Sequence, residues 1–215
     1  MMPHLRVPSG AVVFDLGNVV LFFDHGITCR RLASHYGLKE EFVYRTIFSE
    51  GHERRFDLGE VSPEQFTENC ARSLGITLDP KVFKRFWTEI FWENEEVIGL
   101  LKALRDSVRL ILLSNTNVWH FEYAKEQFDL LHLFDDFVLS FTCGYCKPDK
   151  RIFEQAMKAV RGASPAIYVD DIPEYTQVAT EMGFEGIQFS GSGDLRSRLH
   201  DLRLVDKIDK ISDQA

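Results

Sequence analysis

The sequence lacks any run of about 20 apolar residues, the length that a membrane-spanning helix requires. Residues 1–10 contain no apolar segment of signal-peptide length. Basic residues are scarce: 25 Lys and Arg stand against 33 Asp and Glu, for a net charge of -8. This balance disfavours nucleic acid and anionic membranes as partners. We predict a cytoplasmic protein without nucleic-acid or membrane partners, and the sequence leaves its oligomeric state open.

Cysteine is also rare, with four residues in 215. Cys143 and Cys146 have the C-x-x-C spacing of a redox motif, but the reactive cysteine of such a motif opens a helix. Here Pro148 marks the helix start after both residues. A zinc site would need a second pair at similar spacing, which the sequence does not contain. The spacing favours two small side chains in a loop, and any redox role stays open.

Four short apolar segments, each typical of a buried strand, end in or lead to polar side chains. Residues 11–14 precede Asp15, residues 108–113 precede Ser114 and Asn115, residues 137–140 lead to Lys147, and residues 166–169 precede Asp170 and Asp171. Ligands of open α/β sheets bind at the carboxyl ends of the strands, so we expect these side chains to converge. A nucleophile, hydrogen-bond donors, a cation and carboxylates for a hard metal are what phosphoryl transfer requires.

The segment between Asp15 and Ser114 is several times longer than a single strand-to-strand crossover needs. Apolar residues recur in it at helical spacing over four ranges: 27–36, 39–48, 62–74 and 79–91. We therefore predict a four-helix insertion with linkers near residues 21–25 and 92–96. The domain hypothesis is a core formed by residues 1–21 and 97–215, and a cap formed by residues 22–96.

The rest of the chain alternates strands with helices. We predict helices near residues 95–105, 118–128, 149–160 and 175–182, a fifth strand at 186–189, a final helix at 194–204, and a polar tail to Ala215. This alternation predicts an α/β fold with a mostly parallel sheet and helices on both faces.

Four motifs follow one another in the order and with the spacing of a known family: Asp15-Leu16-Gly17-Asn18-Val19, Leu113-Ser114-Asn115, Lys147-Pro148-Asp149 and Asp170-Asp171. Over nearly its whole length the chain resembles the haloacid dehalogenase-like (HAD) superfamily of phosphohydrolases. Its first two motifs look most like the subgroup around the bacterial α-D-glucose-1-phosphate phosphatase. The resemblance implies a Rossmann-like core beneath a small helical cap.

The resemblance also implies a Mg²⁺-dependent phosphatase whose nucleophile is Asp15, which would form an aspartyl-phosphate. A carboxylate and a phosphate dianion repel each other, and Mg²⁺, which prefers oxygen ligands, would neutralise both. By resemblance, Asp15, the backbone carbonyl of Gly17 and Asp171 contact the metal. Asp170 would contact it directly or through water.

The second and third motifs are expected to bind the phosphate. Ser114 and the backbone amides after it, beginning at Asn115, would donate hydrogen bonds to phosphate oxygens, and Lys147 would neutralise developing charge. The expected catalytic residues are therefore Asp15, Ser114 and Lys147. A single serine after a strand is usually a helix cap, so this prediction depends on the order of the motifs.

Gly17 departs from the family pattern, in which many phosphatases have a second Asp at this position as general acid and base. Loss of a general acid typically costs ~10²–10⁴-fold in rate. Three interpretations follow: Asp24 or His25 substitutes, the substrate has a good leaving group such as an anomeric sugar phosphate or an acyl phosphate, or the protein is a weakly active or non-catalytic regulatory module.

Carbon–halogen hydrolysis is a rival activity within the superfamily, because it also uses an Asp nucleophile. It needs no metal, so the Asp170-Asp171 pair favours a phosphatase. Substrate contacts are expected from the cap, where Arg54 and Arg55 lie in a polar stretch that is equally compatible with a solvated loop. The predicted partner is a small phosphorylated metabolite, which the sequence does not identify.

Overall fold

The computed structural model describes residues 10–202 and 204. Its core is a five-stranded parallel sheet in the order β5-β4-β1-β6-β7. The strands are β1 (Ala11–Phe14), β4 (Arg109–Ser114), β5 (Asp136–Leu139), β6 (Ala166–Asp170) and β7 (Glu185–Gln188). The order places β1 at the centre of the sheet, hydrogen-bonded to β4 on one side and β6 on the other. The predicted α/β fold with a parallel sheet is confirmed.

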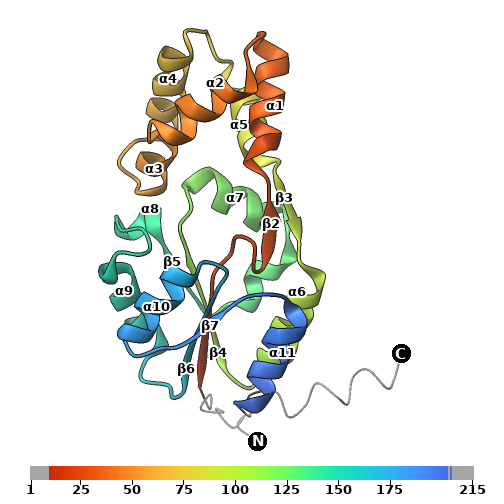
Figure 1. Cartoon of the computed structure of the whole chain (residues 1–215), viewed down its shortest axis with the longest axis vertical. Coiled ribbons are helices and arrows are strands. Elements are labelled where there is room, and N and C mark those ends of the chain that lie inside the picture. Colours follow the sequence, from red (N-terminus) through yellow and green to blue (C-terminus); the bar gives the residue numbers. More distant parts are fainter. Residues whose placement is uncertain (1–9, 203, 205–215) are drawn as a thin grey trace, which may run out of the picture.

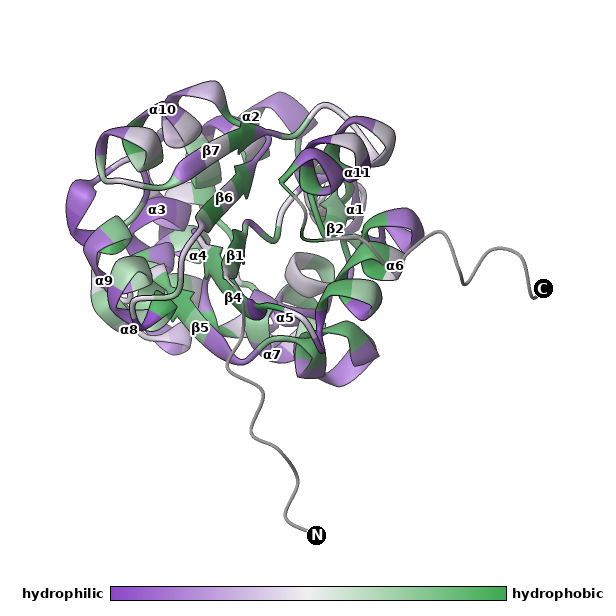
Figure 2. Ribbon diagram, turned by 90° about the horizontal axis from the view of Figure 1, so that it is seen from below, coloured by the Kyte–Doolittle hydropathy of each residue, from purple (hydrophilic) through white to green (hydrophobic). Residues whose placement is uncertain are grey.

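Helices cover both faces of the sheet, as Figure 2 shows from below. They are α6 (Glu95–Leu104), α7 (Val118–Gln127), the 3₁₀-helix η2 (Asp129–Leu133), α8 (Ser140–Cys143), α9 (Lys150–Val160), α10 (Pro173–Glu181) and α11 (Ser192–Asp201). Successive residues of a strand point to opposite faces. Val12 and Phe14 accordingly belong to the hydrophobic cluster with α6 and α11. Ala11 and Val13 belong to a second cluster, with α9 and α10.

The insertion lies between β2 (Leu21–Phe23) and β3 (Phe91–Glu93), two short antiparallel strands that the sequence analysis expected only as linkers. Between them are α1 (His25–Tyr36), α2 (Glu40–Tyr44), the π-helix η1 (Arg45–Ser49), α3 (His52–Asp57), α4 (Pro63–Leu74) and α5 (Pro80–Thr88). The prediction of four helices omitted α3, because a helix of six residues gives too short a periodic pattern. In Figure 1 these helices stand above the sheet, and we propose residues 22–96 as the cap.

The predicted starts of α4 and α5 and the predicted end of α4 are confirmed by their caps, whereas α5 ends at Thr88, before the predicted residue 91, where β3 begins. Ser62 accepts a hydrogen bond from the Gln65 backbone while the Gln65 side chain accepts one from the Ser62 backbone, which forms a capping box. Gly75 ends α4 with a φ of 69°, a conformation that glycine adopts without strain. Asp79 caps α5 through its side chain, which accepts hydrogen bonds from the backbone N–H groups of Lys81 and Val82.

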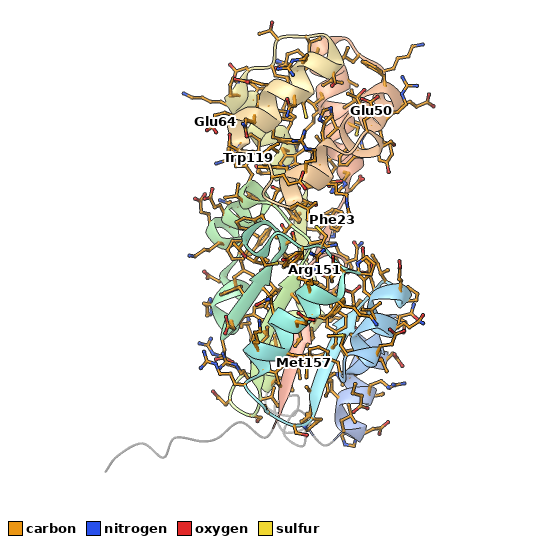
Figure 3. The ribbon with its side chains drawn as sticks, turned by 90° about the vertical axis from the view of Figure 1, so that its left-hand side faces the viewer. Phe23, Glu50, Glu64, Trp119, Arg151 and Met157 are labelled. Carbon is orange, nitrogen blue, oxygen red and sulfur yellow. The ribbon has the colours of Figure 1, made fainter. Side chains whose placement is uncertain are left out.

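The cap has its own aromatic core, and one helix of the catalytic core contributes to it. Trp119, in the first turn of α7, packs among Phe56, Phe66 and Phe83 with ring centroids 5.4–6.1 Å away. Figure 3 shows Trp119 at the level of the cap helices, with Phe23 below it near the junction. The cap is therefore anchored both by its two strands and by α7.

The four cysteines are free thiols. Cys143 ends α8 and Cys146 is buried in the loop that follows. Burial raises the pKa of Cys146 to about 11, so its reactive thiolate form is scarce at neutral pH. This finding argues against a redox role for the pair.

No helix within residues 10–202 is long and apolar enough to cross a membrane. Residue 203 of the predicted last helix (194–204), the predicted tail up to Ala215 and the residues before Gly10 lie outside the part that the structure describes. Within the described part, that helix is α11 and ends at Asp201.

Candidate active site

Asp15 lies directly after β1, at the carboxyl edge of the sheet, and only 7% of it is exposed. Its Oδ1 is 2.8 Å from the Nζ of Lys147. Burial raises the pKa of Asp15 to about 7, against the opposing effect of the Lys147 charge, and the nearby Asp170 raises it further. The predicted nucleophile is therefore a buried carboxyl in contact with a cation.

Lys147 reaches this edge from the loop after α8, and it is also buried. Its Nζ contacts two carboxylates, Asp15 at 2.8 Å and Asp170 at 2.6 Å. Burial alone would lower the pKa of Lys147, but the two carboxylates raise it, so the ammonium stays charged. The side chain of Asn115 holds the backbone of Lys147 on both sides: Oδ1 accepts from its N–H at 2.7 Å, and Nδ2 donates to its carbonyl at 3.1 Å.

Asp170 is fully buried at the end of β6, and both of its oxygens are occupied. Oδ1 accepts a hydrogen bond from the backbone N–H of Ile172 at 2.9 Å. Oδ2 accepts from Lys147 and from the hydroxyl group of Tyr168. Asp170 is therefore held as a fixed partner for Lys147.

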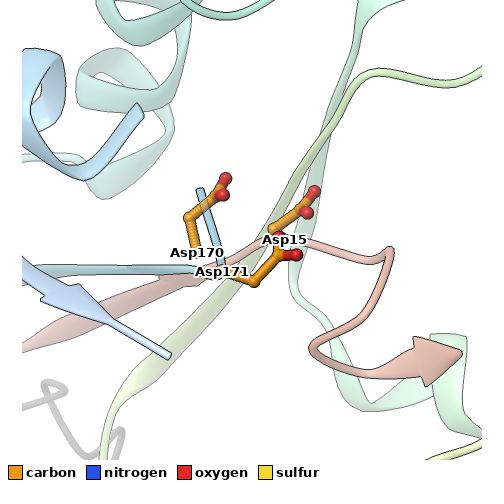
Figure 4. A group of neighbouring side chains, drawn as sticks. All are labelled: Asp15, Asp170 and Asp171. Carbon is orange, nitrogen blue, oxygen red and sulfur yellow. The ribbon is translucent and has the colours of Figure 1, made fainter. Parts of the chain in front are cut away.

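The carboxylate oxygens of Asp15, Asp170 and Asp171 lie within 4.8 Å of one another (Figure 4). Asp171 is half-buried, and its pKa is raised by burial and by the Asp170 charge, while a hydrogen bond from Asn18 opposes this rise. Three carboxyl groups this close repel one another when ionised, and a hard divalent cation removes that repulsion. The all-oxygen donor set fits Mg²⁺, and the Gly17 carbonyl, two residues after Asp15, remains a predicted further ligand.

A cavity of about 400 Å³ opens beside these groups and is lined by residues of both the core and the cap. The core contributes Leu16, Gly17, Ser114 and Asn115. Ser114 is buried at the end of β4, where the sequence analysis placed it. The oxygen and the nitrogen of the Asn115 side-chain amide both bind the backbone of Lys147, and the predicted phosphate contact from Asn115 is through its backbone N–H.

The ring of Phe23 lies directly beside Gly17, the position at which many family members have an aspartate. A Cβ atom built on Gly17 would lie 2.7 Å from Cε1 of Phe23, closer than real Cβ atoms approach carbon. The ring of Phe23 therefore occupies the space that a larger residue at this position would need.

The sequence analysis names Asp24 and His25 as possible proton donors to the substrate, and Arg54 and Arg55 as possible substrate contacts. Of these four residues, only His25 lines the cavity. Asp24 is the N-cap of α1, where it accepts from the Gly26 N–H at 2.7 Å and pairs with Arg30 at 2.9 Å. These hydrogen bonds lower the pKa of Asp24, so it holds no proton to donate. Arg54 and Arg55 are exposed on α3 and do not line the cavity.

The sequence analysis missed two cap carboxyls that do line the cavity, Glu53 and Asp57. They are four residues apart and so lie on one face of α3. His25 lies beside them, with its Nε2 3.4 Å from Oε1 of Glu53. The available signal was the i, i+4 spacing, which identifies a polar helix face but not what that face contacts.

It also missed a buried hydrogen-bond network at the start of α7. The side-chain amide of Asn117 donates to Oδ1 of Asp57 at 2.8 Å and lies 3.1 Å from Nδ1 of His120. Nε2 of His120 lies 3.0 Å from the carbonyl of Trp87. Because that carbonyl can only accept, Nε2 carries the hydrogen and Nδ1 accepts from Asn117. This network ties the Asp57 carboxyl to the catalytic core.

Phosphatases are among the known proteins that this chain resembles in sequence. The D-ribitol-5-phosphate phosphatase of Bacteroides thetaiotaomicron is 27% identical over 201 residues, covering 87% of this chain and 95% of the relative. The sesquiterpene phosphatase astK of Aspergillus oryzae is 22% identical over 185 residues, covering 85% and 90%. The crystal structure of a HAD family enzyme from B. thetaiotaomicron, in complex with magnesium and inorganic phosphate, superimposes with a TM-score of 0.72 at 22% identity, covering 81% and 91%.

The haloacid dehalogenase-like hydrolase model matches residues 10–183. This range spans β1, the insertion, the strands that end in Ser114 and Asp170, and the loop that carries Lys147. These similarities do not confirm the predicted glucose-1-phosphate phosphatase subgroup. The chain belongs to the haloacid dehalogenase-like hydrolase family.

Proposed function

We propose that this hydrolase is a Mg²⁺-dependent phosphatase that transfers the phosphoryl group of a small phosphate monoester to Asp15 and then to water. The observation that carries the proposal is the buried ammonium of Lys147, held between Asp15 and Asp170 next to a third carboxyl, Asp171. Three ionised carboxyls and one ammonium leave the site with a net negative charge, so it attracts a divalent metal ion. The bound metal would in turn attract a phosphate.

Each residue has a role in the proposed reaction. Asp15 is the nucleophile, and its nearly complete burial removes the water that would otherwise compete for its lone pairs. Lys147 orients that carboxylate and stabilises the charge that develops on the phosphoryl group. Asp15, Asp171 and the Gly17 carbonyl would hold the Mg²⁺, which shields the attacking carboxylate from the negative charge of the phosphate when bound. Ser114 would donate to a phosphate oxygen.

A polyol or sugar phosphate is the proposed substrate class. The cavity volume of about 400 Å³ is within the range of ~300–1,000 Å³ typical of small-molecule sites. Its wall combines aromatic rings, such as Phe23 and Phe91, with the polar side chains of Glu53 and Asp57. Carboxyl groups accept hydrogen bonds from hydroxyls and repel further anions. The similarity to a D-ribitol-5-phosphate phosphatase supports this class, and a sugar-1-phosphate remains a candidate within it.

The rival activity, carbon–halogen hydrolysis, is less well supported by the site. Halide leaves without metal assistance, so such a site gains nothing from Asp171 beside Asp15 and Asp170. An extra buried or half-buried carboxyl costs free energy unless a cation compensates it. The clustering of the three carboxyls therefore favours a metal-dependent reaction.

The decisive experiment is a phosphate-release screen over sugar phosphates, polyol phosphates, nucleotides and acyl phosphates, with and without Mg²⁺. Asp15→Asn should abolish release, because an amide cannot form the acyl-phosphate, while thermal unfolding shows a folded protein. The control is Asp129→Asn at an exposed position. Wild-type activity in the Asp15→Asn variant would refute the mechanism, and no release from any ester would favour a regulatory module.

A further inference from the structure

Among the described residues around Asp15, the core offers no carboxylic acid beyond the nucleophile itself and the proposed metal ligands. An ordinary alcohol leaves poorly as an alkoxide, and a general acid contributes ~10²–10⁴-fold to such a step. Gly17 has no side chain, and Phe23 fills the space beside it. Lys147 is already hydrogen-bonded to Asp170 and paired with Asp15. Tyr175 of the core also lines the cavity, but burial raises the pKa of its phenol, which makes it a weaker acid than a carboxyl. A carboxyl proton has to come from the cap wall of the cavity.

The two imidazoles of the cavity are poor candidates. Burial lowers the pKa of His25 to about 4 and that of His120 to about 3, so neither ring is an imidazolium at neutral pH. The two ring nitrogens of His120 are moreover occupied by Asn117 and by the carbonyl of Trp87.

The two cap carboxyls behave in the opposite way. Burial raises the pKa of Asp57 to about 7. Burial and the charge of Asp57 together raise the pKa of Glu53 well above its ordinary value. At least one of these two carboxyls is therefore protonated at neutral pH, and both lie on the helix face that lines the cavity.

Their surroundings decide which of the two carries that proton. Asp57 accepts a hydrogen bond from Asn117 at 2.8 Å, and the nearby Arg54 charge also favours its ionised form. Glu53 lies instead beside the neutral ring of His25, 3.4 Å away, a longer contact than a good hydrogen bond. Two coupled carboxyls in unequal environments take unequal roles. Glu53 holds the proton and Asp57 holds the charge.

The position of α3 brings this pair to the catalytic edge of the core. In Figure 1, α3 is the cap helix next to α8, which precedes the Lys147 loop, and the two helices are in contact. Just after α3, a Cβ on Gly59 would collide with the backbone of Phe141 in α8, so the chain there lies directly against the core. Glu53 thus lines the same cavity as Gly17 and Ser114.

We propose that Glu53 is the general acid and base of the reaction, and that Asp57 is a positioning residue that keeps Glu53 protonated. The inference rests on the proposed phosphatase function and assigns a step for which the described part of the core supplies no carboxylic acid.

The proton balance is complete without any further reactant. As Asp15 bonds to phosphorus, the bond from phosphorus to the ester oxygen breaks and its electron pair stays on that oxygen. Glu53 gives its proton to this oxygen, which leaves as a neutral alcohol. The Glu53 carboxylate then takes a proton from the water that attacks the aspartyl-phosphate, and the bond from phosphorus to Asp15 breaks. Inorganic phosphate leaves, with Asp15 ionised and Glu53 protonated as at the start.

The test compares two esters of similar shape, p-nitrophenyl phosphate and phenyl phosphate, because nitrophenolate leaves readily without a proton and phenolate does not. Glu53→Gln should lower kcat/KM for phenyl phosphate by about 10²-fold or more, and for p-nitrophenyl phosphate by a much smaller factor. Because the same variant lacks the base for the second half, it should release a burst of about one equivalent of nitrophenolate. The matched control, Glu50→Gln, changes an exposed glutamate three residues earlier and should keep the wild-type ratio without a burst.

Equal losses for both esters, with no burst, would overturn the assignment. If Glu53→Gln does not fold, Asp57→Asn provides a second route, because loss of the Asp57 charge lowers the pKa of Glu53. The rate ratio of phenyl to p-nitrophenyl phosphate should then fall at pH 8 but not at pH 6, and an unchanged ratio would overturn the proposal. The charged or titratable side chains around Glu53 are His25 and Cys29 from α1, Arg54 and Asp57 from α3, and His120 from α7.

These outcomes are separable from a failure of the proposed function. If wild-type protein releases phosphate from neither ester, or if Asp15→Asn is fully active, the phosphatase proposal itself fails. If both of those tests succeed and Glu53→Gln still behaves like Glu50→Gln, only the role of Glu53 is refuted.

Discussion

Asp57→Asn should stabilise the protein, and by more at pH 8 than at pH 5. Asparagine keeps the oxygen that accepts from Asn117 at 2.8 Å but cannot ionise. The pKa of Asp57 rises from 3.8 to about 7 on folding, so the folded protein loses stability as the pH increases from about 4 through 7. The shift of roughly 3 units, at ~1.36 kcal/mol per unit, sets an upper limit of about 4 kcal/mol above pH 7.

The same linkage leaves a cost of only about 1.5 kcal/mol at pH 5, where the folded carboxyl is still protonated and the unfolded one is mostly ionised. Urea unfolding of wild-type and variant protein at both pH values measures the difference, which we expect to be about 2–3 kcal/mol larger at pH 8. Asp129→Asn, at an exposed position, is the control. A gain that is equal at both pH values, or larger at pH 5, would refute the claim that folding raises the pKa of Asp57.

Two further predictions concern the metal site and the turn after β1. Asp171→Asn should weaken Mg²⁺ binding in calorimetric titrations more than Asp170→Asn does, because the oxygens of Asp170 already accept from protein donors; an equal or larger loss in the Asp170 variant would contradict the assignment. Gly17→Ala should cost about 1–3 kcal/mol through its clash with Phe23. Adding Phe23→Ala should then cost less than the sum of the two single changes in denaturant unfolding, and strict additivity would show that the ring does not limit this position.

The catalytic edge of the core could be predicted from the sequence because parallel strands end on the same side of their sheet. This rule predicts that Asp15, Ser114 and Asp170 lie together, and the structure has all three at strand ends. The same rule says nothing of the cap. Which face of α3 meets the core depends on docking against α7 and α8, and the sequence pattern of a six-residue helix does not encode it.

Predictions of site residues from residue type alone failed where that residue type has a second structural role. Asp24 was a candidate proton donor because it follows the first motif closely, but an aspartate before a helix is also a common cap, and this one caps α1. Arg54 and Arg55 were candidates because they are basic, yet their positions on α3 leave them exposed. The side chains that face the cavity are their neighbours Glu53 and Asp57, which a search for phosphate-binding residues does not select.

The position of Trp119 has a consequence for how such enzymes are recombined. The aromatic core of the cap is incomplete without an indole that the chain adds only after α6 and β4. A cap transplanted to another member of the family as residues 22–96 alone would therefore carry an indole-sized hole among Phe56, Phe66 and Phe83. Residues 117–120 would have to travel with it, since they supply both Trp119 and the Asn117 amide that holds Asp57. The segment to be exchanged in such a transplant is therefore discontinuous: the cap together with the first turn of α7.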